Sequence, residues 1–175
     1  LPQRMESVLN QTFADFEVIL MDDCSPDNSV EILKSYAEKD ARIRLVLNEK
    51  NSGSTFAQWN KGVALAKGDY VWIAESDDYC ELNLLETLVP LLDKNPNVGI
   101  AYAQSTIVDE KSEPINSYNE NYKFIFKSSR WESDFIVDGK KECADYLIFS
   151  NIIPNASGAL MRKSVYQNCG GAEMG

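Results

Sequence analysis

The chain has 175 residues, 44% of them hydrophobic, and carries a formal net charge of −10 at pH 7. This composition predicts one compact domain with a substantial core, and the acidic charge without any basic cluster argues against nucleic acid as a partner. The chain contains no histidine, so serine–histidine catalysis and histidine-ligated zinc are excluded within it.

The N-terminal half predicts helices and strands in alternation. Each strand is a short apolar run rich in β-formers, and each helix carries apolar residues at helical spacing. The predicted strands are Phe16–Met21, Ile43–Leu47 and Tyr70–Ala74, and the predicted helices are Pro2–Leu9, a helix capped at Asn28 or Ser29, and Thr55–Ala66. The short connections favour parallel strands with right-handed crossovers.

The second half has weaker signals. It predicts a helix over Leu84–Leu92, a strand over Val98–Ala103, a short helix over Cys143–Ser150 and a loop entering a strand over Ile152–Arg162. The stretch Glu110–Trp131 is polar and aromatic without clear periodicity, and we expect a long excursion there. Residues 1–175 form one domain in this interpretation.

Two of the predicted strands end in paired acids, Asp22-Asp23 and Asp77-Asp78, and Glu75 adds a third carboxylate beside the second pair. The carboxyl ends of parallel strands share one edge of a sheet, where open α/β sheets bind ligands. Clustered carboxylates repel one another unless a cation or hydrogen bonds offset the repulsion, and Mg²⁺ or Mn²⁺ prefers such oxygen ligands together with a substrate phosphate. Asp77 and Asp78 therefore predict a metal–diphosphate site; the alternative is a solvated acidic turn that caps the helix starting near Leu82.

Several stretches together resemble the family 2 glycosyltransferases, in the order in which they occur in that family. They are Ser7–Phe13, Phe16–Ser29, Asn51–Gly53, Asn60–Gly62, Ala66–Tyr79 and Ser157–Arg162. The resemblance implies an α/β fold of the GT-A type, Rossmann-like, with three α/β/α layers and a mostly parallel central sheet. It also implies transfer of a sugar from a nucleotide-diphospho-sugar, most often a UDP-sugar, to an acceptor hydroxyl with inversion.

The resemblance assigns expected roles to individual residues. Those expected at the nucleotide are Asp22, Asp23, Asn51, Gly53 and Asp77, with Asp23 at the base. Those expected at Mg²⁺ or Mn²⁺ are Asp78 first, then Asp77, with Glu75 third. Those expected on the acceptor side are Asn155, Ser157 and Gly158. Residues 1–103 would form the nucleotide-binding half, and residues 104–175 would begin the acceptor-side half.

The sequence departs from the family pattern in three places. The chain starts just after the family's usual first strand, so a strand order of 3-2-1-4 would leave a gap of one strand between Phe16–Met21 and Tyr70–Ala74. Gln58-Trp59 stands where many relatives carry an arginine. The catalytic base of the family follows the Gly170-Gly171 landmark and is expected beyond Gly175.

The acceptor implied by the resemblance is a glycan or a lipid-linked molecule in bacterial cell-surface polysaccharide synthesis. No apolar run is long enough to span a membrane, and the scattered cysteines favour a reducing compartment. We therefore expect a cytoplasmic domain, or one peripheral to the cytoplasmic face of the inner membrane. The alternatives are a non-catalytic nucleotide-sugar-binding module and a nucleotidyltransferase, which would normally show a glycine-rich, lysine-bearing phosphate loop.

Overall fold

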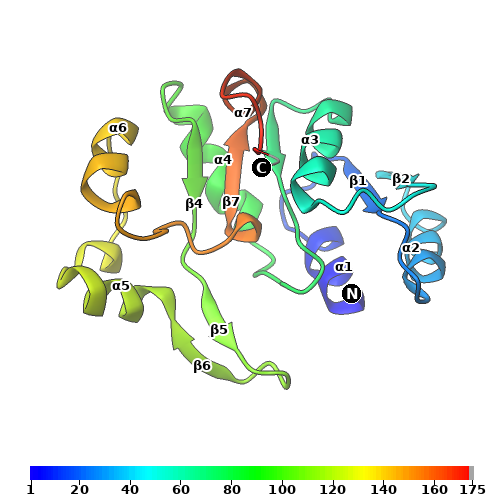
Figure 1. Ribbon diagram of the computed structural model, residues 1–175, viewed down its shortest axis with the longest axis horizontal. Helices are drawn as coiled ribbons and strands as arrows, with labels where there is room; N and C mark the ends of the chain where they lie inside the picture. The colour runs from blue at the N-terminus through cyan, green and yellow to red at the C-terminus, as the bar shows by residue number, and fades with distance from the viewer. Residues whose placement is uncertain (174–175) are drawn as a thin grey trace.

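The computed structural model describes residues 1–173, whose strands form three separate small sheets. Figure 1 shows the β1–β2 pair with α2 on one side of the molecule, the β4 and β7 strands with α4 in the middle, and the β5–β6 hairpin with α5 and α6 on the other side. Residues far apart in the sequence are thus brought together at the central sheet.

The elements of the N-terminal half follow the predicted alternation closely. In order they are α1 (Pro2–Leu9), β1 (Val18–Asp22), α2 (Ser29–Ala37), β2 (Ile43–Leu47), α3 (Thr55–Leu65), β3 (Tyr70–Trp72), α4 (Leu84–Lys94) and β4 (Ile100–Tyr102). The structure confirms the expected N-cap position of α2 at Asn28. The strand β3 ends two residues earlier than predicted, so the acid-bearing loop begins at Ile73.

The second half contains β5 (Thr106–Val108), β6 (Pro114–Ser117), α5 (Tyr118–Phe126), α6 (Gly139–Glu142), β7 (Ala159–Arg162) and α7 (Lys163–Asn168). Single helical turns occupy Arg130–Glu132, Cys143–Leu147 and Ala156–Gly158. The stretch Glu110–Trp131 therefore includes part of a hairpin and a helix that its weak periodicity did not predict. Within the described part of the chain, no helix combines the length and apolar character needed to cross a membrane.

The β1–β2 pair is parallel, as the short helical connection between its strands predicted. The register pairs Val18 with Ile43 and Asp22 with Leu47. The strand ends are therefore level, and the backbone N–H of Asn48 donates to the carbonyl of Asp22 at 2.9 Å. This register places the residues after Asp22 beside the loop that follows β2.

The central sheet has the order β3-β7-β4, with β7 antiparallel to both neighbours. The α/β fold class is confirmed, but the expectation of a mostly parallel sheet is wrong in this part. The strands β3 and β4 are parallel to each other and are connected through α4. The strand β7, from the C-terminal part of the chain, lies between them in the sheet. The strands β1 and β3 do not pair, in agreement with the expected strand order.

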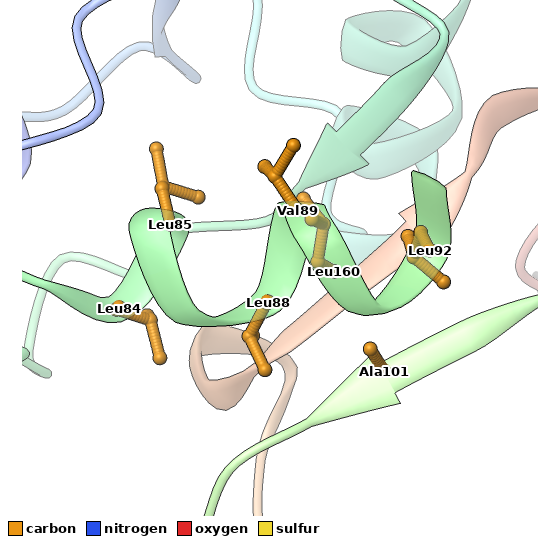
Figure 2. Close-up of a cluster of buried hydrophobic side chains, with 7 residues drawn as sticks. All are labelled: Leu84, Leu85, Leu88, Val89, Leu92, Ala101 and Leu160. Carbon is orange, nitrogen blue, oxygen red and sulfur yellow. The ribbon is translucent and has the colours of Figure 1, made fainter. Parts of the chain in front are cut away.

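The main core lies between α4 and the central sheet (Figure 2). Its fully or nearly fully buried residues are Leu84, Leu85, Leu88, Val89, Leu92, Ala101 and Leu160. Five of them recur along one face of α4, and burying each such side chain contributes about 1.5–3 kcal/mol. Because α4 follows the acid-bearing loop directly, this core anchors one end of that loop and β3 anchors the other.

A second, aromatic core supports the other side of the molecule. Tyr122, Trp131 and Ile152 are buried there, and Tyr118, Phe126, Phe135, Tyr146 and Leu147 pack around them. Arg130 lies over the rings of Phe135 and Tyr146 at 4.1 and 4.6 Å and pairs with Glu142 at 2.7 Å. These contacts hold α5 and α6 together, although each helix is short.

Candidate functional site

Asp22 closes a turn at the end of β1. Its side chain is buried, and the Oδ1 atom accepts a hydrogen bond from the backbone N–H of Ser25 at 3.0 Å. Cys24 within this turn has a φ of +64°, in the left-handed region that few residues other than glycine adopt. The carboxylate of Asp22 therefore shapes the turn that presents Asp23.

Asp23 receives hydrogen bonds from three side chains of the neighbouring loop and helix. Its Oδ1 atom accepts from Asn48 Nδ2 at 2.6 Å and from Gln58 Nε2 at 3.0 Å. Its Oδ2 atom accepts from Ser52 Oγ at 2.7 Å, and the Ser52 backbone N–H lies 3.0 Å from both oxygens. These contacts define an Asp23 corner, made of Asp23, Asn48, Ser52 and Gln58 with their connecting loop.

The Asp23 corner stabilises the charged form of its carboxylate. The hydroxyl of Ser52, followed by the Asn48 amide and the Ser52 backbone N–H, holds the pKa of Asp23 below its usual range. Gln58 contributes an amide donor and no positive charge to this corner. The only cation acting on this carboxylate in the described residues is Lys61, which also donates to Asn48 Oδ1.

Asn51 and Gly53 complete the loop of this corner. Asn51 Nδ2 donates to the Asp23 carbonyl at 2.7 Å, and Asn51 Oδ1 accepts from the backbone N–H of Gly53 at 2.8 Å. Gly53 has a φ of +70°, a conformation that a residue with a Cβ adopts only under strain. The structure therefore brings Asp22, Asp23, Asn51 and Gly53 together, as predicted, and gives each a defined local contact.

The acid loop, residues 73–80 after β3, has a different electrostatic character. Asp77 is exposed, and Glu75 and Asp78 are half-buried. Burial, together with the charges of Asp78 and Asp77, raises the pKa of Glu75 above its usual range. None of the ion pairs in the described residues includes one of these three acids. The negative charges of the acid loop are therefore not neutralised by direct pairing.

Ser157 joins the predicted acceptor side to the acid loop. Its buried hydroxyl accepts a hydrogen bond from the backbone N–H of Glu75 at 3.0 Å, and its carbonyl accepts from Trp72 Nε1 at 2.7 Å. These bonds connect residues more than eighty positions apart in the sequence. The loop before β7 thus fixes the start of the acid loop.

Asn155 and Gly158 form the turn that presents Ser157. Asn155 Oδ1 accepts from the backbone N–H of Gly158 at 2.7 Å, and Asn155 Nδ2 donates to Ser105 Oγ at 3.3 Å. A Cβ on Gly158 would lie 3.1 Å from Asn155 Oδ1, which is too close without a shift of that side chain. The three predicted acceptor-side residues therefore lie together, and their contact with an acceptor stays a prediction.

Arg4 is a residue of this region that the sequence did not indicate. It lies on α1 with only 3% of its surface exposed, and its Nε donates to the Glu75 carbonyl at 2.9 Å. Burial lowers the pKa of Arg4, while the charges of Cys80, Asp78 and Asp77 act in the opposite direction. The sequence does show a lone arginine beside Met5 and Val8 on an apolar helix face. It could not show the hydrogen-bond partner of this arginine, because Glu75 lies 71 residues away.

In the described residues, Asp23 shares no hydrogen bond or ion pair with the acid loop. The Asp23 corner follows β1, the acid loop follows β3, and these strands belong to different sheets. Across residues 1–173, no three aspartate, glutamate, cysteine or histidine side chains converge where one metal ion could bind. A cation at the acid loop would therefore need further oxygen ligands from a bound molecule.

The sequence matches a known protein family. A family model described as Glycosyl transferase family 2 matches residues 1–170. The glycosyltransferase GlyG of Streptococcus pneumoniae is 33% identical over 159 residues, which cover 90% of this chain and 46% of that protein. TuaG of Bacillus subtilis, named a putative teichuronic acid biosynthesis glycosyltransferase, is 42% identical over 114 residues, which cover 65% of this chain and 44% of that protein.

The fold has close structural counterparts. The crystal structure of S. aureus TarS residues 1–349 in complex with UDP superposes with a TM-score of 0.68 at 20% identity, covering 97% of this chain and 44% of that 1–349 chain. The chain therefore spans less than half the length of each of these relatives. With a family match that extends from the first residue to Gly170, the chain belongs to glycosyl transferase family 2.

Proposed function

We propose that this chain is the donor-binding part of an inverting glycosyltransferase that uses a UDP-sugar and a divalent cation. The proposal rests on the contrast between two regions. Hydrogen bonds hold the carboxylate of the Asp23 corner in place, whereas the carboxylates of the acid loop form no ion pair in the described residues. The first suits a neutral, hydrogen-bonding group, and the second suits a cation. Family membership and the complex of TarS with UDP support a nucleotide-sugar donor.

The Asp23 corner is the proposed site of the nucleoside. Asp23 is exposed enough to meet a ligand, and its ionised carboxylate accepts hydrogen bonds only. The imide N–H of uracil is a donor of the required kind. The base would bind if this N–H replaced one of the present hydrogen-bond donors to Asp23. Asp22, Asn51 and Gly53 act in this proposal by fixing the backbone around Asp23.

The acid loop is the proposed site of Mg²⁺ or Mn²⁺. Its donors are carboxylate oxygens, which suit these hard cations, and oxygens of the diphosphate would complete the coordination, because in the described residues no three such side chains converge. Asp78 and Asp77 are the proposed ligands, with Glu75 third. A bound cation would neutralise the charge that develops on the departing diphosphate.

The acceptor side of the proposal is residues 104–175, including the loop with Asn155, Ser157 and Gly158. An acid beyond Gly175 would deprotonate the acceptor hydroxyl, and attack on the anomeric carbon opposite the diphosphate would invert its configuration. The name of TuaG, a putative teichuronic acid biosynthesis glycosyltransferase, supports a glycan acceptor in bacterial polysaccharide synthesis. The proposed location of this reaction is the cytoplasm or the cytoplasmic face of the inner membrane.

Calorimetry with UDP-sugars, with Mn²⁺ and then with EDTA, tests the proposal. We expect binding that depends on Mn²⁺ and little release of free sugar, because the catalytic acid is proposed to lie beyond Gly175. Release of free sugar would indicate an enzyme and not a non-catalytic module, and binding that is unchanged in EDTA would count against the metal site. Release of pyrophosphate from a nucleoside triphosphate and a sugar phosphate would instead indicate a nucleotidyltransferase.

A further inference from the structure

Arg4 is a buried cation with unused hydrogen-bond donors. Only 3% of its surface is exposed, and within the described residues neither terminal guanidinium nitrogen, Nη1 or Nη2, has a hydrogen-bond partner. The remaining donor, Nε, bonds the Glu75 carbonyl, and the guanidinium lies 5.2 Å from the centre of the Trp72 ring. Because a buried charge without partners is costly, its retention at this position requires a compensating interaction.

The acid loop provides that interaction at longer range. The charges of Asp77 and Asp78 act on Arg4, although neither side chain forms an ion pair with it. Cys80, the last residue of the loop, uses its sulfur to contact Ser7 and Gln11, and it also interacts with the Arg4 side chain. Arg4 therefore lies close to a group of negative charges and contacts the loop at the Glu75 carbonyl and at Cys80, without a direct bond to a carboxylate.

We propose that Arg4 is the resident counter-charge of the acid loop and a positioning residue for its cation. It offsets the repulsion among the carboxylates when no cation is bound, and it opposes the entry of a cation that arrives alone. The negative diphosphate of a donor would cancel this opposition. Arg4 thereby couples cation binding to donor binding, an inference that rests on the proposed function.

A purely structural role makes a different prediction. If Arg4 only packs against Trp72 and holds the Glu75 carbonyl, its replacement should loosen the loop and weaken cation binding. If it acts through charge, removing the charge should strengthen the binding of Mn²⁺ alone, because one positive charge near the site has gone. The sign of the change in affinity therefore separates the two roles.

The test uses two variants of similar length. Arg4→Met removes the charge, and Arg4→Lys retains it while losing the fork of guanidinium donors. Mn²⁺ binding is measured by the paramagnetic resonance signal of the free ion, with and without UDP. We expect Arg4→Met to bind Mn²⁺ alone roughly tenfold more tightly than the unmodified protein and to gain less from UDP. Arg4→Lys should stay close to the unmodified protein.

Arg42 provides a matched control. It also donates to a backbone carbonyl, that of Leu9 at 2.8 Å, and lies over an aromatic ring, that of Phe16 at 4.5 Å. Its carboxylate partner is Asp40, not a residue of the acid loop. Arg42→Met should therefore lower the melting temperature without changing the affinity for Mn²⁺.

The outcomes separate this inference from the function on which it rests. No binding of Mn²⁺ by the unmodified protein, even with UDP, would overturn the metal site and the role of Arg4 with it. Normal UDP-dependent Mn²⁺ binding together with an unchanged or weaker affinity in Arg4→Met would overturn the role of Arg4 alone. Should Arg4→Met fail to fold, Arg4→Gln removes the charge and retains a donor for the Glu75 carbonyl. Its affinity for Mn²⁺, measured with and without UDP, then distinguishes the two roles in the same way.

Discussion

The Asp23 corner and the acid loop both arise from a strand that ends in paired acids, yet they have opposite electrostatic states. Asp23 accepts hydrogen bonds from Asn48, Ser52 and Gln58, and its pKa is lowered. In the acid loop the pKa of Glu75 is raised by burial and by its acidic neighbours. The difference shows that the hydrogen-bond donors supplied by other elements decide whether the pKa of a strand-end acid is lowered or raised.

The largest expected effect is that of removing Asp78. Asp78→Ala should weaken Mn²⁺-dependent binding of a UDP-sugar by about 30-fold or more, equivalent to roughly 2 kcal/mol, because a charged ligand of the cation is lost. Circular dichroism should show an intact fold, since the half-buried side chain is not part of the core. Calorimetry measures the affinity, with Asp134→Ala as the control for loss of an exposed acid elsewhere. Equal affinities of Asp78→Ala and the control would rule out the metal role.

A smaller effect is expected at the Asp23 corner. Asp23→Asn keeps the shape of the side chain but removes its charge, so it should weaken the binding of uridine by roughly tenfold, the equivalent of one hydrogen bond to a charged group. The loss should be the same with and without Mn²⁺, because the side chains that bond to Asp23 in the described residues all lie outside the acid loop. Fluorescence or calorimetric titration with uridine checks this, and a loss seen only with Mn²⁺ would show that the two regions do not act independently.

The smallest expected effects are on stability, and they differ in sign between the two regions. The pKa of Asp23 is lower in the folded protein than its ordinary value of 3.8, so the folded state gains stability above that pH and loses it as the pH falls through the folded pKa. The melting temperature of the unmodified protein should therefore exceed that of Asp23→Asn at neutral pH, and the two should converge in acid.

Glu75 should behave in the opposite way. Its pKa is raised in the folded protein, so its ionisation destabilises the fold once the pH rises above its ordinary value of 4.5. Glu75→Gln should therefore melt at a slightly higher temperature than the unmodified protein at neutral pH and at the same temperature in acid. Thermal melts across this pH range compare the variants, and a less stable Glu75→Gln at neutral pH would show that the acid loop is already neutralised.

The sequence predicted the N-terminal half well because its signals are local. Apolar runs of β-formers identified β1 and β2, and helical spacing identified α1 through α4 within a few residues. The position of β7 could not be predicted in this way, because its pairing joins Val71 to Met161 across the chain. The helix α5 was missed although Tyr118, Tyr122 and Phe126 recur every four residues, because Phe124 and Ile125 lie exposed on its other side and obscure the pattern.

The candidate site was also predictable only in part. Asp23, Asp77 and Asp78 were indicated by their positions after apolar strands. The hydrogen-bond partners of Asp23 and the burial of Arg4 under the acid loop depend on contacts between distant residues, such as that of Arg4 with Glu75. The positions of these acids at strand ends were thus predictable from the sequence. The opposite pKa shifts of Asp23 and Glu75 required the structure.

In the proposed function, the Asp23 corner holds the nucleoside and the acid loop holds a cation together with the diphosphate. A comparison of uridine with UDP, in titrations of the unmodified protein with and without Mn²⁺, tests this division. We expect Mn²⁺ to leave the affinity for uridine unchanged and to increase the affinity for UDP at least tenfold, equivalent to about 1.4 kcal/mol. An equal effect of Mn²⁺ on both ligands, or no effect on UDP, would contradict it.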